Sequence, residues 1–237
     1  MDLHGHQDGH HSDHQSNPHE HGALEHHQTI MGEILCHLPY AIFAVAFSLI
    51  CMSLLSFMPT SEAYEAGCHR LFHNFHFLHL LFAATGTMLT FRRYSNNVIL
   101  GLAVGFLVPA VFCTFSDAVL PYLGGTMLGL DMHLHFCFFA HLDTVLPFLF
   151  IGMINGWAMS THAKSLQLFY SIGFHVVHIF ISSMASLLYL VSFGFTDWWT
   201  RMGFVFIFKI IAVLIPCTLS DIVVPMFFAR LKKHSKN

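Results

Sequence analysis

The sequence predicts an all-α membrane protein with six transmembrane helices, arranged as two three-helix repeats of opposite orientation. The composition is the first observation behind this prediction: 55% of the 237 residues are hydrophobic, only 10% are charged, and the mean hydropathy is +0.61. Soluble domains carry about 25% charged residues. The second observation is a series of long apolar runs, and the third is a nine-residue motif that occurs twice.

Six apolar segments are each long enough to cross about 30 Å of hydrocarbon as a helix. Inside lipid every backbone N–H and C=O must bond within the protein, so isolated spanning segments are helices. The short polar connections between them, such as FRRYSNN and STHAK, are typical of adjacent antiparallel helices. The expected spans are 34–58, 71–91, 98–122, 133–158, 166–193 and 203–229.

The first thirty residues differ from the rest of the chain. They contain nine of the 21 histidines, interleaved with Asp, Gly and Ser, and almost nothing apolar. This composition predicts a disordered tail that captures metal ions. The tail holds no Lys or Arg and no early apolar run, so we expect no cleavable signal peptide. The predicted organisation is a His-rich tail over 1–30, a first repeat over 31–127 and a second repeat, with a short basic end, over 128–237.

The positive charges predict the orientation, because cytoplasmic loops are enriched in Lys and Arg. One side of the membrane receives only Arg70 and Arg201, while Lys209 is expected inside a span with its ammonium reaching the outer interface. Both termini are therefore predicted to be cytoplasmic. The basic residues on their side are Arg92, Arg93, Lys164, Arg230, Lys232, Lys233 and Lys236.

An internal repeat extends over both halves of the chain. CTFSDAVLP at 113–121 returns as CTLSDIVVP at 217–225, and HNFHFLHLLFAATGTMLTF from His73 is similar to HVVHIFISSMASLLYLVSF from His175. A weaker match pairs CHL at 36–38 with AHL at 140–142. Each half would contain three spans. Because three is odd, the second half must be inverted relative to the first, an architecture common in transporters.

Three carboxylates lie within the expected spans: Asp117, Asp143 and Asp221. An unpaired Asp at the centre of a span costs about 2.5–3.5 kcal/mol on insertion scales. No buried Arg is available to pair with them, whereas histidines are abundant. Each Asp also precedes a proline by four residues, and proline lacks the N–H that would bond the Asp carbonyl. A bound divalent cation would neutralise these acids and use neutral imidazoles as further ligands.

The inverted arrangement predicts two equivalent clusters, with Asp143 as a further candidate ligand. Three imidazoles and a carboxylate in each suit Zn, Ni, Co, Fe or Mn better than Ca or Mg. The outer cluster is predicted to contain His73, His76, Asp117 and His141. The inner cluster is predicted to contain His37, His175, His178 and Asp221.

Other polar residues in the apolar segments are interpreted as structural. Histidines near the expected span ends, namely His79, His133, His135 and His162, are typical of the membrane interface. The six cysteines are expected to be reduced, and those of the repeated motif to pack rather than bind metal. Hydrogen bonds between helices, typically worth about 0.6 kcal/mol, are the alternative explanation for the buried Asp and His. The number of buried Asp and His residues favours a functional site.

The predicted function is transport of a divalent transition-metal ion, which is a substrate rather than a resident cofactor. The predicted partners are the lipid bilayer and the metal ion, with no nucleic acid, and a homo-oligomer is compatible with the sequence. Two alternatives stay open. One is a membrane haem protein with paired axial histidines, and the other is a metal-dependent intramembrane enzyme. The enzyme is disfavoured because such sites usually recruit Glu, which the spans lack.

Overall fold

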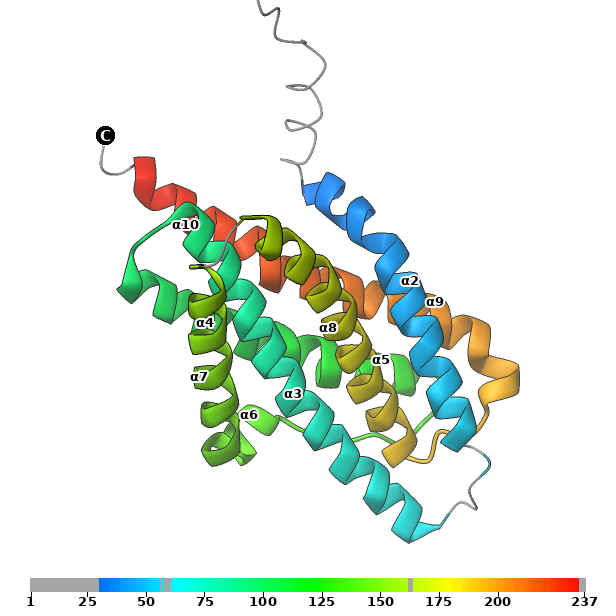
Figure 1. The fold of residues 1–237 in the computed structure, drawn as a ribbon. Helices are drawn as coiled ribbons and strands as arrows, with labels where there is room; N and C mark the ends of the chain where they lie inside the picture. Colours follow the sequence, from blue (N-terminus) through cyan, green and yellow to red (C-terminus); the bar gives the residue numbers. More distant parts are fainter. Residues whose placement is uncertain (1–29, 56, 58–60, 162–163, 235–237) are drawn as a thin grey trace, which may run out of the picture.

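The computed structural model describes residues 30–55, 57, 61–161 and 164–234, and every regular element within them is helical (Figure 1). The predicted all-α class is therefore confirmed, whereas the His-rich tail lies outside the described residues. The elements are α2 (Ile30–Leu55), α3 (Glu62–Tyr94), α4 (Val98–Thr114), η2 (Phe115–Val119), α5 (Leu120–Met127), α6 (Cys137–Ala140), α7 (Leu142–Met159), α8 (Lys164–Ser192), α9 (Trp198–Thr218), η3 (Leu219–Val223) and α10 (Val224–His234).

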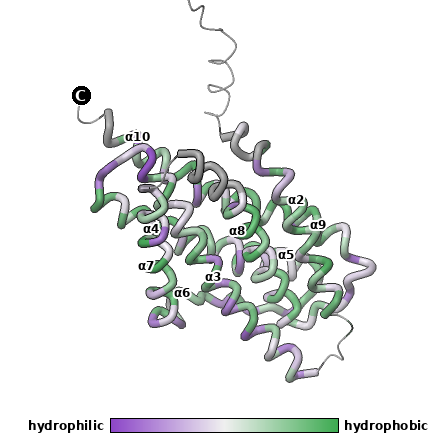
Figure 2. The backbone as a smooth tube through the Cα atoms, in the orientation of Figure 1, coloured by the Kyte–Doolittle hydropathy of each residue, from purple (hydrophilic) through white to green (hydrophobic). Residues whose placement is uncertain are grey.

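Within the described ranges, five helical segments are long and apolar enough to cross a membrane: His37–Leu55, Val98–Met127, Leu142–Met159, Gly173–Ser192 and Trp198–Leu231. Hydrophobic positions run along these segments in Figure 2, and large apolar side chains cover much of the outer surface. Such an extensive exposed apolar surface is expected where the solvent is lipid. The chain is thus a membrane protein by length and composition of its helices. The expected span 71–91 lies in α3 and is not among these five segments, because the histidines and other polar residues of α3 lower its hydropathy.

The connection before α7 differs from the prediction. Residues 128–136 are not helical, although the fourth expected span begins at 133. Gly129 has φ +84°, and the N–H of Leu130 donates to the Gly125 carbonyl at 3.0 Å, which closes the end of α5. As a consequence α7 begins only at Leu142. Asp143 lies in its first turn, at the start of the candidate span Leu142–Met159, and is exposed, so the expectation that it is buried is wrong.

Helix α3 lies in the middle of the bundle and packs against α4, α7 and α8 (Figure 1). Its contact with α7 depends on two glycines four residues apart. A Cβ on Gly152 would lie 2.4 Å from the Leu81 carbonyl oxygen, and a Cβ on Gly156 would lie 2.4 Å from that of Thr85. Small residues at this spacing let membrane helices approach closely. The backbone of α7 therefore lies directly on α3.

The two halves of the chain exchange packing partners. Helix α2, the first of its half, packs against α8 and α9, and α7, the first of the other half, packs against α3 and α4. The second helices of the two halves, α3 and α8, pack against each other. Each side chain that α3 or α8 directs inward can thus meet residues from the other half.

Both copies of the repeated motif form a short π-helical segment. In η2 the N–H of Leu120 donates to the Phe115 carbonyl, and in η3 the N–H of Val224 donates to that of Leu219. Pro121 and Pro225 follow at the start of the next helix, where a missing N–H is tolerated. Single π-helical turns are frequent at functional sites. Here each one carries an aspartate into the interior of the bundle, where Asp117 is 0% and Asp221 is 2% exposed.

Candidate metal centre

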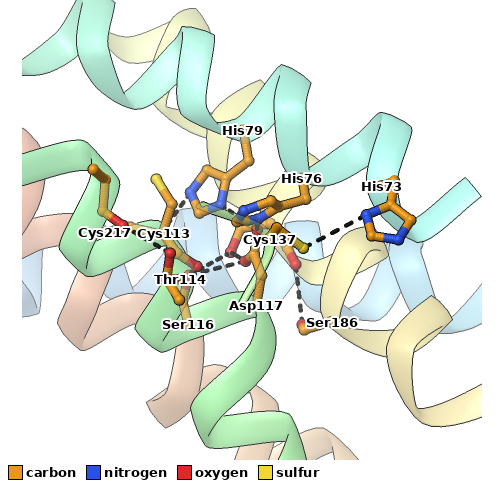
Figure 3. Close-up of polar contacts among 12 residues, drawn as sticks. His73, His76, His79, Cys113, Thr114, Ser116, Asp117, Cys137, Ser186 and Cys217 are labelled. Atoms are coloured by element: carbon orange, nitrogen blue, oxygen red, sulfur yellow. Dashed lines mark hydrogen bonds and ion pairs between the residues drawn. The ribbon is translucent and has the colours of Figure 1, made fainter. Parts of the chain in front are cut away.

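Asp117 is the centre of the first polar group. Its Oδ2 accepts hydrogen bonds from Nδ1 of His76 at 2.9 Å and Nδ1 of His79 at 2.7 Å. Its Oδ1 accepts from the hydroxyls of Ser116 and Ser182, each at 2.9 Å. Figure 3 shows both imidazoles descending from α3 toward the carboxylate on η2. Ser182 belongs to α8, so both halves contribute to this buried network.

Asp221 is the centre of the second polar group. Its Oδ2 lies 2.6 Å from Nδ1 of His178 and 3.5 Å from Nδ1 of His175. The ring centroids of His175 and His37 are 4.3 Å apart, which extends the group to α2. In contrast to Asp117, the second carboxylate oxygen of Asp221 is buried without a hydrogen-bond partner among the described residues.

These contacts orient the imidazoles for metal binding. An ionised carboxylate can only accept, so a histidine bonded to it through Nδ1 carries its proton there. In a neutral ring the other nitrogen, Nε2, then presents a lone pair. The Nε2 atoms of His76, His175 and His178 are buried and have no hydrogen-bond partner in the described part of the chain. A carboxylate behind a histidine is the usual support of a metal-binding imidazole.

Among the residues that the structure describes, three sets of side chains bring their ligand atoms within 4.8 Å of one another, and each set could hold a metal ion. We call them the outer, central and inner groups. His178 is shared by the central and inner groups. The outer group is His73, His135 and His141, the central group is His79, His178 and Cys217, and the inner group is His175, His178 and Asp221.

The outer group is half-buried and lies where α3, α7 and the 128–136 connection meet. The ring of His73 lies 4.9 Å from that of His141 and 5.4 Å from that of His135. In the connection, partial burial and the neighbouring His69 and His141 lower the pKa of His135. His135 is consequently neutral near pH 7 and able to donate a lone pair. The Cys137 thiol, 3.5 Å from Nδ1 of His73, lines the deeper side of this group.

The structure brings together the four residues predicted for the inner cluster, with His37 in ring contact rather than in the ligand group itself. The four predicted outer residues are divided. His73 and His141 belong to the outer group, while His76 and Asp117 lie deeper beside His79. Asp143 belongs to none of the three groups, because its position at the start of α7 leaves it exposed.

Sequence reasoning missed three of the grouped residues. His79 follows His76 by three residues on α3, so the spacing H-x-x-H-x-x-H was the available signal for it. Cys217 stands in the repeated motif itself, next to the π-helical segment. His135 lies in the non-helical connection, and only its folding back onto α3 reveals its role.

Lys209 also differs from its prediction. Its side chain is 1% exposed, and its Nζ has no hydrogen-bond partner among the described residues. It therefore does not reach the interface, because α9 turns this position toward the bundle interior. Asp117 is the carboxylate whose charge acts on it. The Lys209 amine is thus a buried titratable group near the first polar group.

Comparisons with known protein families, with curated proteins and with solved structures found no match to this chain. The functional interpretation therefore rests on the chemistry of the buried side chains.

Proposed function

We propose that this protein transports a divalent transition-metal ion across the membrane through the three histidine-containing groups. The observation that carries the proposal is their arrangement in series. The outer and central groups are joined along α3, and the central and inner groups share His178. Both halves of the chain contribute ligands to the central group, as expected for a site at a repeat interface.

The helices that carry the ligands give the series a direction. On α3, the step from His73 to His79 advances about 9 Å along the axis, at about 1.5 Å per residue. Helix α8 runs antiparallel to α3 in Figure 1, so the step from His178 back to His175 continues in the same direction. The rings of His79 and His178, 4.6 Å apart, join the two parts. A row of imidazoles in this order suits stepwise transfer of an ion.

The topology that suits this function has six crossings. We propose α3 as the sixth, with its polar residues shielded from lipid by α4, α7 and α8. The start of α2 and the end of α10 lie at the same end of the bundle in Figure 1, which agrees with an even number of crossings. The Lys and Arg asymmetry then supports cytoplasmic termini. The paired π-helical segments and the exchange of packing partners support an inverted repeat.

The haem alternative has less support. Axial histidines must lie on opposite faces of a macrocycle, whereas the rings of His79 and His178 are in direct contact. Two described cavities, of about 340 and 420 Å³, are lined almost entirely by apolar side chains of α4 with α6 and of α2 with α8, and by no histidine. An enzyme would also need space for an organic substrate beside the ligands, and neither of these two cavities lies beside them.

Flux into vesicles tests the proposal. The purified full-length protein is reconstituted in liposomes that contain a metal-sensitive dye, and Zn²⁺, Co²⁺, Ni²⁺, Fe²⁺ or Mn²⁺ is added outside, with Ca²⁺ and Mg²⁺ as comparisons. We expect uptake of at least one transition metal and its loss in His178→Ala, because His178 is shared by two groups. His133→Ala, which removes an exposed imidazole outside all three groups, should retain uptake.

Two results would contradict the proposal. One is uptake no faster than in protein-free vesicles for every metal. The other is wild-type uptake by a correctly folded His178→Ala variant, with folding checked by gel filtration.

A further inference from the structure

In the central group, the two repeated aspartates determine the orientation of both histidine rings. Nδ1 of His79 is bonded to Asp117 at 2.7 Å, and Nδ1 of His178 is bonded to Asp221 at 2.6 Å. Each ring therefore turns its Nε2 away from its carboxylate. Nε2 of His79 lies 3.6 Å from the Cys217 sulfur, and Nε2 of His178 is buried without a hydrogen-bond partner among the residues that the structure describes. All three side chains are fully or almost fully buried.

We propose that His79, His178 and Cys217 form the selectivity site for a thiophilic metal ion, and that Asp117 and Asp221 position the two histidines rather than bind the ion while it is held at this site. The site rests on the proposed function only for the identity of its cargo, since metal binding can be measured without transport. It differs from the two predicted clusters in its ligands and in its location between them.

The site unites the two halves of the chain. The first half supplies the Asp117–His79 pair, and the second half supplies the Asp221–His178 pair. A carboxylate–histidine pair fixes both the ring orientation and the tautomer of a metal ligand, and losing the carboxylate typically lowers metal affinity about 10- to 100-fold. Cys113, the repeat counterpart of Cys217, also interacts with both imidazoles. Each copy of the motif thus brings a thiol and an oriented imidazole to the same place.

The donor set selects among metals. One sulfur and two imidazole nitrogens, with a fourth position left for water or an exchanging ligand, suit tetrahedral Zn²⁺ or Co²⁺. At bond lengths of about 2.0–2.3 Å the donors of a tetrahedral site lie about 3.3–3.8 Å apart. The present separations, up to 4.8 Å, require only a small contraction. Mg²⁺ and Mn²⁺ prefer oxygen ligands, so a sulfur ligand discriminates against them. Coordination requires the thiolate, and the Cys217 proton leaves as the ion binds.

The shared ligand determines how the ion moves on. His178 also belongs to the inner group with His175 and Asp221, whose free carboxylate oxygen is an available ligand. Nδ1 of His178 donates to Asp221, so only its Nε2 can bind a metal ion, and it can bind one ion at a time. Therefore the central and inner groups are alternative positions of one ion, which exchanges Cys217 and His79 for His175 and Asp221 as it passes.

Cobalt spectroscopy on the purified full-length protein tests the site. Co²⁺ bound to a thiolate gives an intense near-ultraviolet charge-transfer band, and tetrahedral Co²⁺ gives strong visible bands. The His-rich tail contains no cysteine before Cys36 and cannot produce the thiolate band from its own residues. We expect the thiolate band in the wild type and in Cys51→Ser, whose half-buried thiol belongs to none of the three ligand groups. We expect its loss in Cys217→Ser.

The positioning role of the aspartates has its own signature. Asp221→Asn should keep the thiolate band but weaken Co²⁺ binding by about 10- to 100-fold, because the orienting carboxylate is lost while the three ligands stay. Loss of the band in Asp221→Asn at saturating Co²⁺ would show that the carboxylate is needed as a ligand.

The results separate this site from transport. A thiolate band that persists in Cys217→Ser would overturn the site. Vesicle uptake of Co²⁺ without any thiolate band would leave transport standing and reject the site. A thiolate band that depends on Cys217, in a protein with no vesicle uptake of any metal, would establish the site and reject transport.

Discussion

The two aspartates of the repeated motif occupy the same backbone position but differ in their surroundings. Each is the third residue of a π-helical segment and lies beside two histidines of one long helix, α3 for Asp117 and α8 for Asp221. Asp117 accepts hydrogen bonds from both of its histidines, whereas Asp221 accepts one from His178 and lies 3.5 Å from Nδ1 of His175. Asp117 also receives two serine hydroxyls and has both oxygens bonded. Asp221 keeps one buried oxygen that has no hydrogen-bond partner in the described part of the chain. The motif therefore fixes where the carboxylate lies, while its neighbours decide whether an oxygen stays available.

The difference originates in the opposite half of the chain. Helix α8 presents Ser182 to Asp117, whereas α3 presents Gly86 to Asp221. A Cβ on Gly86 would lie only 2.9 Å from Cγ of Asp221, so no donor side chain fits there. Thr87 beside it donates instead to the Ser220 carbonyl at 2.9 Å. The first aspartate is thus closed into a hydrogen-bond network, and the second keeps one oxygen without a hydrogen-bond partner among the described residues.

Replacing each aspartate by asparagine should give the largest difference in stability between the Asp117 and Asp221 positions. In Asp117→Asn one oxygen that accepts hydrogen bonds becomes an NH₂ group, which can only donate. Both oxygens of Asp117 face donors, so the NH₂ group meets a donor in either orientation of the amide. Where it faces the two serines, their hydroxyls must rotate to accept from it. We expect a loss of about 2 kcal/mol in the free energy of unfolding, since hydrogen bonds to a charged group are worth about 1.5–3 kcal/mol. In Asp221→Asn the NH₂ can take the place of the unpartnered oxygen. The loss should be below about 1 kcal/mol.

The unfolding midpoint of the metal-free protein in detergent, measured with a chelator present, checks this order. Both variants should lose metal transport, because each disturbs the orientation of a histidine in the central group. An equal loss of stability in the two variants would show that the free oxygen of Asp221 has a partner in the membrane, and the comparison would then fail.

The sequence predicted those parts of the site that depend on local spacing. His175 and His178 are one helical turn apart, and Asp221 stands in a repeated motif on the next segment, so their convergence followed from two local patterns. Asp143 had the same apolar context and the same proline four residues later, yet residues 128–136 form no helix and shift it to a helix start. Proline spacing alone does not distinguish a buried position from a first turn.

Contacts between the halves could not be predicted in the same way. His79 appeared to lie near the end of a span, but α3 begins at Glu62 and places it near the middle of a 33-residue helix. Its Nε2 meets Cys217, a residue of the other half. The crossing of α3 and α8 determines this meeting, and neither helix alone encodes it. The roles of Ser182 and Gly86 depend on the same crossing.

Substituting Gly86 should disturb the surroundings of Asp221 and leave those of Asp117 unchanged. In Gly86→Ala the new methyl group would lie 2.9 Å from the Asp221 carboxylate, so the carboxylate must shift and its hydrogen bond with His178 is disturbed. Overpacking of this kind typically costs about 1–3 kcal/mol, and we expect metal uptake into vesicles to fall several-fold. Gly67→Ala on the same helix is the matched control. Nothing lies within 4 Å of its Cβ, and it should gain about 0.5–1 kcal/mol from helix propensity.

A wild-type rate of uptake in Gly86→Ala would mean that the Asp221 carboxylate can move without affecting the ion. The inner group would then not depend on the present contact between Asp221 and His178.

The smallest effect is expected at Ser182, whose hydroxyl donates to Asp117. Ser182→Ala removes one of two hydroxyls bonded to Oδ1 of Asp117 and leaves the other, from Ser116, in place. A net loss of about 1 kcal/mol in stability is expected for one hydrogen bond. The neighbouring Ser183 provides the control, because its buried hydroxyl has no hydrogen-bond partner among the described residues. Ser183→Ala should therefore be neutral or slightly stabilising. If Ser182→Ala is as stable as Ser183→Ala, the Asp117 network is not closed by α8, and the contrast between the two aspartates must come from their histidines alone.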